Sequence, residues 1–256
     1  MAFEYAGSMY GGSTTPFLLN LQVGADCYVG QLVMNDHALG YGHILPAAVA
    51  AAGPDVTAGL VGVVVGAITS PTYTAATYQS DKITYDTTQA TQVANDPVGA
   101  AEAQVAIMRP GDLWKAPIGK ATIATALDVI TVTTTDTAGD DVIHTGTITA
   151  PTHLLSTVYC RTGANKGLYR VITSGGTADQ DLTICFPYDI TSGDTFVAAD
   201  VKLGSCRIDL STNSLGLDAS AATNYYDAFC TELNLEVSGE EYAVISFATH
   251  HIWDTR

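Results

Sequence analysis

Short runs rich in Thr, Val, Ile and Tyr recur along this chain, and Gly, Asp, Asn and Pro separate them. Residues 128–135, Asp-Val-Ile-Thr-Val-Thr-Thr-Thr, show the pattern clearly, because Ile130 and Val132 fall on one face of a strand and threonines on the other. β-Branched and aromatic residues favour strands, and the separating residues favour turns. The pattern therefore predicts an all-β fold of mainly antiparallel sandwich or barrel domains, with sheets partly exposed to solvent.

Twelve segments are expected to form strands: 17–23, 28–34, 60–68, 105–108, 128–135, 142–149, 154–160, 167–173, 181–186, 195–203, 205–210 and 241–247. One or two short helices are expected beside them. Asp218 can cap a helix in which apolar residues recur at three- and four-residue spacing up to Phe229. A second short helix is expected at 96–104, where Asp96 and Pro97 suit the cap and the first helical position.

The segment 109–120 is expected to separate two parts of the chain. It holds two prolines, two glycines and three of the ten basic residues, a composition typical of turns and extended connections. We therefore predict an extended N-terminal arm at 1–18 and a β domain at 19–110. A linker or crossing strand at 111–120 and a second β domain at 121–256 complete the expected organisation.

The charge of the chain excludes several classes of protein. Ten Lys and Arg against 26 Asp and Glu give a net charge of −16, only 14% of residues are charged, and the mean hydropathy is +0.19. Disordered proteins are usually much less apolar than this chain. Because the chain is strongly acidic, we expect it to bind neither nucleic acid nor anionic membranes. The longest apolar runs, 44–53 and 59–68, are about half of the ~20 residues of a spanning helix.

The N-terminal residues lack the positive charge of a secretory or transit peptide, since the first basic residue is Lys82. We therefore expect a protein that is intracellular or that leaves the cell without a signal sequence.

Motifs that carry chemistry are missing from the sequence. It contains no GxSxG, HExxH or GxGxxG motif and no CxxC pair. We therefore predict no enzyme activity, no cofactor and no metal site. The five cysteines are far apart and lie among apolar neighbours, which favours buried free thiols and leaves one disulfide open as an alternative; they are Cys27, Cys160, Cys185, Cys206 and Cys230.

The segment 160–170 is distinctive because it places Arg161, Lys166 and Arg170 close together in an acidic chain. One interpretation is a site for an anion such as phosphate. The favoured alternative is a hairpin with a Gly-Ala-Asn-Lys-Gly loop, whose basic side chains pair with acidic neighbours.

The C-terminal half contains the run Arg-Thr-Gly-Ala-Asn-Lys-Gly-Leu-Tyr-Arg-Val-Ile at 161–172, a strand ending at Phe186 and a Gly-Asp turn within 190–196. In these features it resembles virion structural proteins of tailed bacteriophages. The N-terminal half is similar in style to head decoration (cement) proteins, through residues 28–33, 44–46, 59–64 and the turn at Gly111-Asp112. Such a family brings no catalytic residues with it.

The resemblance implies a non-enzymatic structural protein that decorates and stabilises a phage capsid by binding the major capsid protein. It implies a homo-oligomer, with a trimer favoured, on the capsid exterior. The alternative is a head-fibre or tail adhesin that binds a host glycan or receptor.

The N-terminal arm is the expected contact region for a partner. Its aromatic and Met side chains are separated by Gly and Ser, so they are expected to dock on a neighbouring subunit and not to build a core. The alternative is a terminal strand packed against its own domain. The candidate contact residues are Phe3, Tyr5, Met9, Tyr10 and Phe17.

Overall fold

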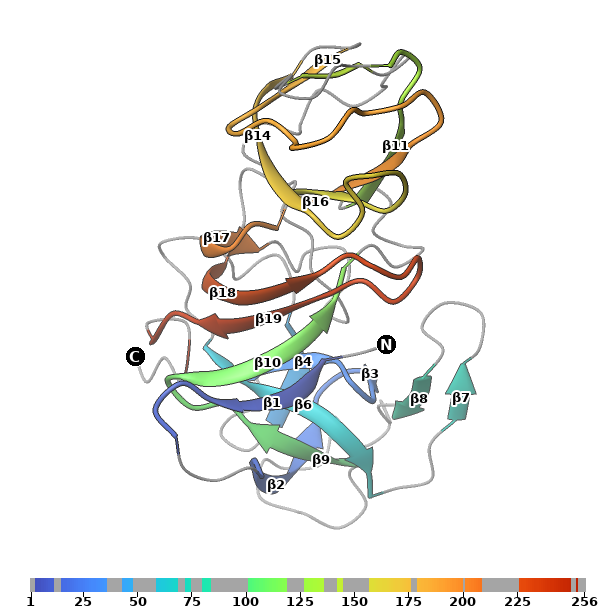
Figure 1. Ribbon diagram of the computed structural model, residues 1–256. Coiled ribbons are helices and arrows are strands. Elements are labelled where there is room, and N and C mark those ends of the chain that lie inside the picture. Colours follow the sequence, from blue (N-terminus) through green and yellow to red (C-terminus); the bar gives the residue numbers. More distant parts are fainter. Residues whose placement is uncertain are drawn as a thin grey trace.

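The computed structural model describes residues 3–11, 15–35, 43–47, 59–68, 72–74, 80–83, 101–118, 127–135, 142–144, 157–175, 179–199, 201–208, 226–249 and 252. These residues are almost entirely strands and turns, and none of them lies in an α-helix. The prediction of an all-β fold is confirmed. Figure 1 shows three layers, with a barrel below, a central sheet in the middle and a six-stranded unit above.

The central sheet joins parts of the chain that lie far apart in sequence. Its strands are all antiparallel and stand in the order β1 (Glu4–Ser8), β10 (Asp112–Pro117), β19 (Tyr242–Phe247), β18 (Tyr226–Asn234) and β17 (Gly204–Ile208). The two segments expected to be an arm and a linker or crossing strand thus pair with each other and with the C-terminal hairpin. The expected boundaries at 18, 110 and 120 do not separate independent sheets, because backbone hydrogen bonds cross all of them.

A closed barrel packs against one side of this sheet. Its strands follow the order β2 (Phe17–Val23), β5 (His43–Pro46), β4 (Leu32–Asn35), β6 (Leu60–Ala67) and β9 (Glu102–Ile107). The described pairs are antiparallel except β2 with β5. Gly62 is required where β6 meets β9, because a Cβ there would overlap the backbone carbonyl of Ala106.

A small sheet of three strands adjoins the barrel, in the order β3 (Cys27–Tyr28), β8 (Ser80–Ile83) and β7 (Thr72–Thr74). Cys27 and Ile83, which are paired in this sheet, are both buried in the core cluster of the barrel. The small sheet is therefore continuous with the barrel interior.

The six-stranded unit, residues 127–199, is inserted in the chain between β10 and β17 of the central sheet. Its strand order is β11 (Leu127–Thr131), β16 (Thr195–Ala199), β13 (Thr157–Cys160), β14 (Tyr169–Gly175), β15 (Asp179–Leu182) and β12 (Val142–His144). As the alternation predicted, Ile130 and Val132 are buried and the threonines beside them are exposed.

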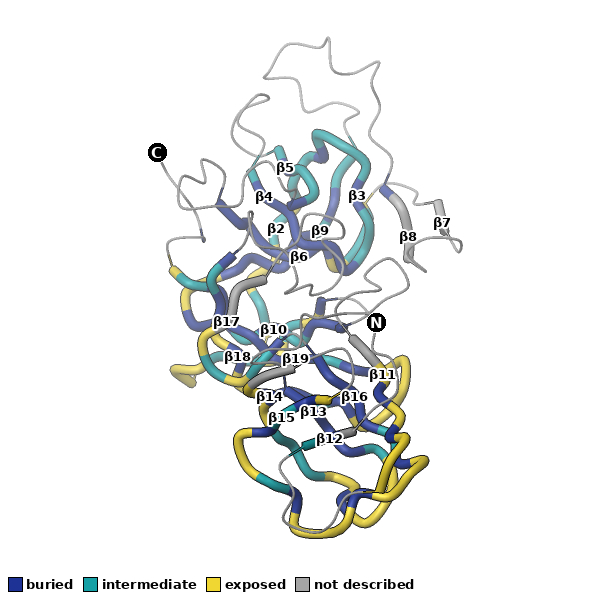
Figure 2. The backbone as a smooth tube through the Cα atoms, turned by 90° about the horizontal axis from the view of Figure 1, so that it is seen from above, coloured by how far each residue is buried: buried dark blue, intermediate teal, exposed yellow. Residues whose placement is uncertain are grey.

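One cluster of buried apolar side chains joins the three layers. Leu60 of the barrel, Trp114 and Ile245 of the central sheet, and Tyr159 and Val197 of the six-stranded unit all belong to it. The six-stranded unit and the barrel each have a second core of their own. Figure 2 shows buried strand segments in all three units, whereas the outer loops of the six-stranded unit are exposed. The fold is therefore three β units held by one shared core.

The two expected helices are wrong wherever the structure describes them. Residues 226–229 lie in β18, residues 102–104 lie in β9 and Ala101 lies outside any helix; the rest of both segments lies outside the described residues. In β18, Tyr226 and Ala228 are buried and Phe229 is exposed. Spacing of three and four residues placed Tyr226 and Phe229 on one helix face, but the strand period of two puts them on opposite faces.

Candidate interaction surfaces

Two of the five candidate contact residues lie in the chain's own core. Phe3 is buried, and its backbone N–H donates to the carbonyl of Gly30 at 3.1 Å. The half-buried ring of Tyr5 packs edge-to-face against Trp114 of β10, with 5.4 Å between centroids. Strand β1 is thus a terminal strand packed on its own sheet, with the ring of Phe3 buried and the ring of Tyr5 partly covered.

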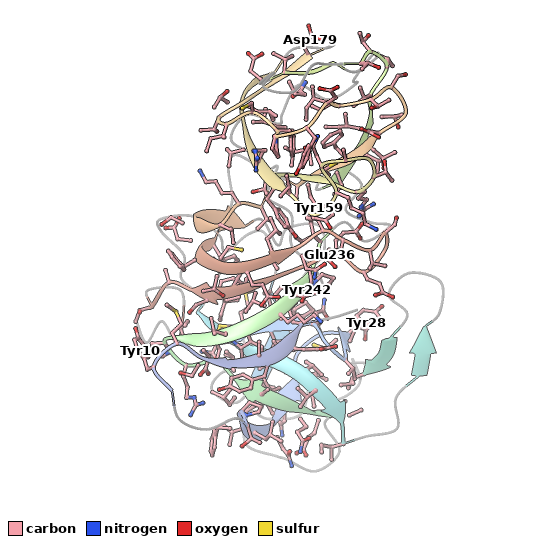
Figure 3. The ribbon with its side chains drawn as sticks, in the orientation of Figure 1. Tyr10, Tyr28, Tyr159, Asp179, Glu236 and Tyr242 are labelled. Atoms are coloured by element: carbon pink, nitrogen blue, oxygen red, sulfur yellow. The ribbon has the colours of Figure 1, made fainter. Side chains whose placement is uncertain are left out.

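The other three candidates, Met9, Tyr10 and Phe17, remain exposed, with exposed fractions of 48%, 80% and 56%. We call them the aromatic edge. The N–H of Met9 donates to the carbonyl of Gly111 at 2.9 Å, and a Cβ at Gly111 would overlap the Tyr10 ring. Tyr10 therefore lies against the β9–β10 connection, at the outer margin of the molecule in Figure 3.

Strand pairing fixes the backbone on either side of the aromatic edge. Ser8 pairs with Asp112 of β10, and Phe17 pairs with Ile107 of β9. The edge residues therefore flank the connection at 108–111. An exposed Tyr held by ordered backbone loses little conformational freedom on binding, which favours a docking role.

An ion pair stiffens that connection. The buried carboxylate of Asp112 accepts from the Arg109 backbone N–H at 3.0 Å and from its Nε and Nη2 at 3.2 and 3.3 Å. The hydrogen bond and the charge of Asp112 raise the pKa of Arg109. Arg109 is itself well exposed, so the β9–β10 connection presents a cation to solvent. Tyr and Arg are both frequent in binding hot spots.

The segment 160–170 forms the turn that the favoured interpretation described. Gly163 and Gly167 have φ values of +87° and +92°. Arg161 is paired with Glu241, and Arg170 donates from Nε to the carbonyl of Cys185 at 3.0 Å. Both arginines therefore bind within the chain, which argues against an anion site.

A second exposed surface lies on the outer loop of the six-stranded unit, residues 183–190, which exposes Ile184 by 64% and Tyr188 by 59%. The buried side chain of Asn165 donates to the carbonyl of Tyr188 at 2.8 Å and accepts from its N–H at 3.1 Å. Arg170 also lies over the ring of Phe186, 4.8 Å from its centroid. The sequence analysis missed this surface, because Asn165 reads locally as a turn residue and its partner is 23 positions away.

The described thiols are free and mostly enclosed. Cys27, Cys160 and Cys230 are buried and Cys185 is half-buried, as the prediction of free thiols expected. Burial, and then the charge of a nearby Asp, raise the pKa of both Cys27 and Cys160 to about 12. These thiols are therefore neutral and poor nucleophiles. The side chain of Cys206 lies outside the described residues.

Within the described ranges, no group of three or more His, Cys, Asp or Glu residues is placed to hold a metal ion. The described part of the chain also contains no helix with the length and apolar character needed to cross a membrane.

The chain matches no protein-family model, no curated protein and no solved structure.

Proposed function

We propose that this chain is a non-enzymatic virion structural protein that decorates and stabilises a phage capsid by binding the major capsid protein. The aromatic edge carries the proposal. Tyr10 exposes 80% of its surface although the backbone beside it is hydrogen-bonded to Gly111. Exposed apolar side chains on an ordered frame are typical of surfaces that bind another protein.

The build of the molecule suits a reinforcing role. One core joins all three β units, so load applied at one unit is carried to the others through packed side chains. The net charge of −16 suits the capsid exterior better than an interior filled with DNA. In this proposal the chain acts as a homo-oligomer, with a trimer favoured, and each copy bridges capsid subunits.

The first experiment measures where the chain lies on particles. Virions of the phage that carries it are purified, and its copies are counted against the major capsid protein and located by cryo-electron microscopy. We expect a number of copies close to that of the capsid subunits, all on the head. Copies confined to the tail tip, or particles without the chain, would contradict the proposal.

A matched pair of variants tests the aromatic edge. Tyr10→Ala/Phe17→Ala is expected to lose binding to undecorated capsids, whereas Ile184→Ala/Tyr188→Ala removes a similar apolar surface elsewhere and is expected to keep it. Thermal unfolding of both variants is the control for folding. Equal binding by the two variants would remove the edge from the proposal.

A second candidate function is a head-fibre or tail adhesin that binds a host glycan or receptor. The outer loop favours it, because Asn165 and Arg170 fix the loop backbone while Tyr188 stays exposed for stacking. A glycan array and adsorption to host cells test it. A binder is expected to retain affinity as a purified chain and to lose it in Tyr188→Ala, while Tyr10→Ala stays unchanged.

A further inference from the structure

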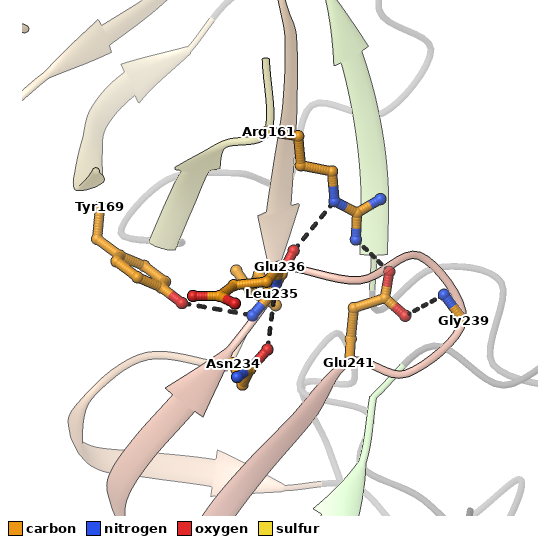
Figure 4. Close-up of polar contacts among 7 residues, drawn as sticks. All are labelled: Arg161, Tyr169, Asn234, Leu235, Glu236, Gly239 and Glu241. Carbon is orange, nitrogen blue, oxygen red and sulfur yellow. Dashed lines mark hydrogen bonds and ion pairs between the residues drawn. The ribbon is translucent and has the colours of Figure 1, made fainter. Parts of the chain in front are cut away.

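A buried ion pair joins the six-stranded unit to the central sheet. Arg161 follows β13, and Glu241 precedes β19, 80 positions away. The Arg161 Nη2 donates to Oε1 of Glu241, and the two side chains are 12% and 5% exposed. Figure 4 shows the Arg161 guanidinium in contact with both the Leu235 carbonyl and the Glu241 carboxylate.

Further hydrogen bonds fix both ions in one arrangement. The Arg161 Nε donates to the carbonyl of Leu235 at 3.0 Å, and the Glu241 Oε2 accepts from the N–H of Gly239 at 2.8 Å. The loop between β18 and β19 is thereby held at both of its ends. Breaking one side of such a buried pair leaves an uncompensated charge, so the pair tolerates little displacement.

Tyr169 makes a second connection at the same place. Its hydroxyl donates to the carbonyl of Leu233 at 3.1 Å and accepts from the N–H of Leu235 at 3.4 Å. Its ring packs on Tyr159, with 4.6 Å between centroids. Burial raises the pKa of Tyr169, which keeps the hydroxyl protonated and able to donate.

The topology explains what this contact can control. The six-stranded unit leaves the central sheet after Pro117 of β10 and returns at Gly204 of β17. Two chain connections alone permit rotation of an inserted unit. Apolar packing around Tyr159 and Val197 attaches the unit to the central sheet, but apolar contacts do not depend on direction. Hydrogen bonds and ion pairs do depend on direction, so they can fix an orientation.

We propose that Arg161, Glu241 and Tyr169 form a lock that fixes the orientation of the six-stranded unit on the central sheet. With the lock closed, the barrel, the sheet and the inserted unit respond as one rigid body. With the lock removed, the inserted unit rocks on its apolar contact while each unit stays folded.

The test measures a distance distribution across the joint in the full chain. Nitroxide labels at Asn20→Cys on the barrel and Lys166→Cys on the six-stranded unit are both at exposed positions. The background carries Cys185→Ser and Cys206→Ser. Double electron–electron resonance is expected to give a narrow distribution for the native lock and one broadened by about twofold in Arg161→Met/Glu241→Met. Replacing both ions by apolar side chains often preserves folding, which is the reason for this choice.

Arg109→Met is the matched control, because it removes an arginine from an ion pair that lies far from the joint in sequence and within the β9–β10 connection. Its distribution is expected to stay narrow. If the double Met variant does not fold, Tyr169→Phe, which removes one hydroxyl, is measured instead and is also expected to broaden the distribution. Unchanged width in the folded lock variant, or equal broadening in the control, would overturn the proposal.

Discussion

The ring of Tyr5 stands edge-on to the indole of Trp114, at 5.4 Å between centroids and 75° between planes. Tyr5 belongs to β1 and Trp114 to β10, and the two residues are also partners in the strand register. The same N-terminal segment continues to Tyr10, which is exposed. A ring that stabilises the fold and an exposed ring are thus only five positions apart in the sequence, and the difference between them can be measured.

Tyr5→Ala is expected to lower the free energy of unfolding by about 1–3 kcal/mol, because it removes a half-buried aromatic pair. Tyr10→Ala is expected to change it by no more than about 0.5 kcal/mol, as is usual for an exposed side chain. Urea unfolding of both variants checks the comparison. Similar losses in the two variants would mean that Tyr10 is part of the fold as well.

Trp114 offers a test of an unsatisfied donor. Its ring is fully buried, and its Nε1 has no hydrogen-bond acceptor within the described part of the chain. Trp114→Phe loses some packing but also removes this unsatisfied donor. We therefore expect the free energy of unfolding to fall by about 1 kcal/mol or less. Trp114→Ala leaves a cavity and is expected to cost about 3–5 kcal/mol. If denaturant titrations show the same loss of stability for Trp114→Phe and Trp114→Ala, the indole N–H has a hydrogen-bond acceptor after all.

Gly163 and Gly167 form a matched pair in one turn. Both have positive φ, but a Cβ at Gly163 would overlap the carboxylate of Asp194, whereas a Cβ at Gly167 meets nothing within 4 Å. Asp194 cannot easily move, because it is buried and accepts from the N–H of Thr191 at 2.9 Å. Gly167→Ala is expected to cost about 1–2 kcal/mol from backbone strain alone, and Gly163→Ala about 2 kcal/mol more.

Thermal unfolding of the two glycine variants measures the difference. A Gly163→Ala protein no less stable than Gly167→Ala would show that the Asp194 carboxylate yields without loss.

Alkaline pH is expected to destabilise the fold through its buried thiols. The pKa of Cys27 rises from 9.0 to about 12 on folding, with burial as the main cause. Between those values the unfolded chain has lost this proton and the folded chain has kept it, so the free energy of unfolding falls as pH rises. The slope is about 1.4 kcal/mol per pH unit for each such thiol, and Cys160 behaves alike.

Urea unfolding between pH 8 and 11 measures this slope. Cys27→Ala removes one titrating thiol and is expected to show a shallower decline above pH 9 than the native chain. Parallel curves for the two proteins would contradict the assignment of the decline to Cys27.

Local sequence was a good guide to the bounds of two of the barrel strands. The bounds expected for 17–23 agree with β2, and those for 60–68 differ from β6 by one residue. In both cases turn-forming residues flank the strand, and their effect is local because it depends only on neighbouring residues in the sequence. The strand at 226–234 was missed because its apolar residues fit both a helical spacing of three and four and a strand alternation. Pairing with β17 and β19 selects the strand.

The candidate surface was predicted only in part. Five apolar residues were expected to act together, and the structure divides them: Phe3 and Tyr5 are covered by other strands, while Met9, Tyr10 and Phe17 are not. Nothing in residues 1–18 alone distinguishes the two groups, because the covering residue Trp114 is more than 100 positions away. The sequence predicted that basic side chains of 160–170 pair with acidic neighbours, but it did not identify Glu241, 80 positions away, as the partner of Arg161.

The sequence by itself determined that this chain is built of antiparallel strands and turns, since side-chain alternation and glycine at positive φ act over a few bonds. The tertiary structure alone decided which strands meet, which aromatic rings are covered and which charges become paired. Whether a residue is buried depends on which residues lie next to it in space. β pairing brings together segments that are far apart in sequence, and no local pattern in either segment identifies its partner.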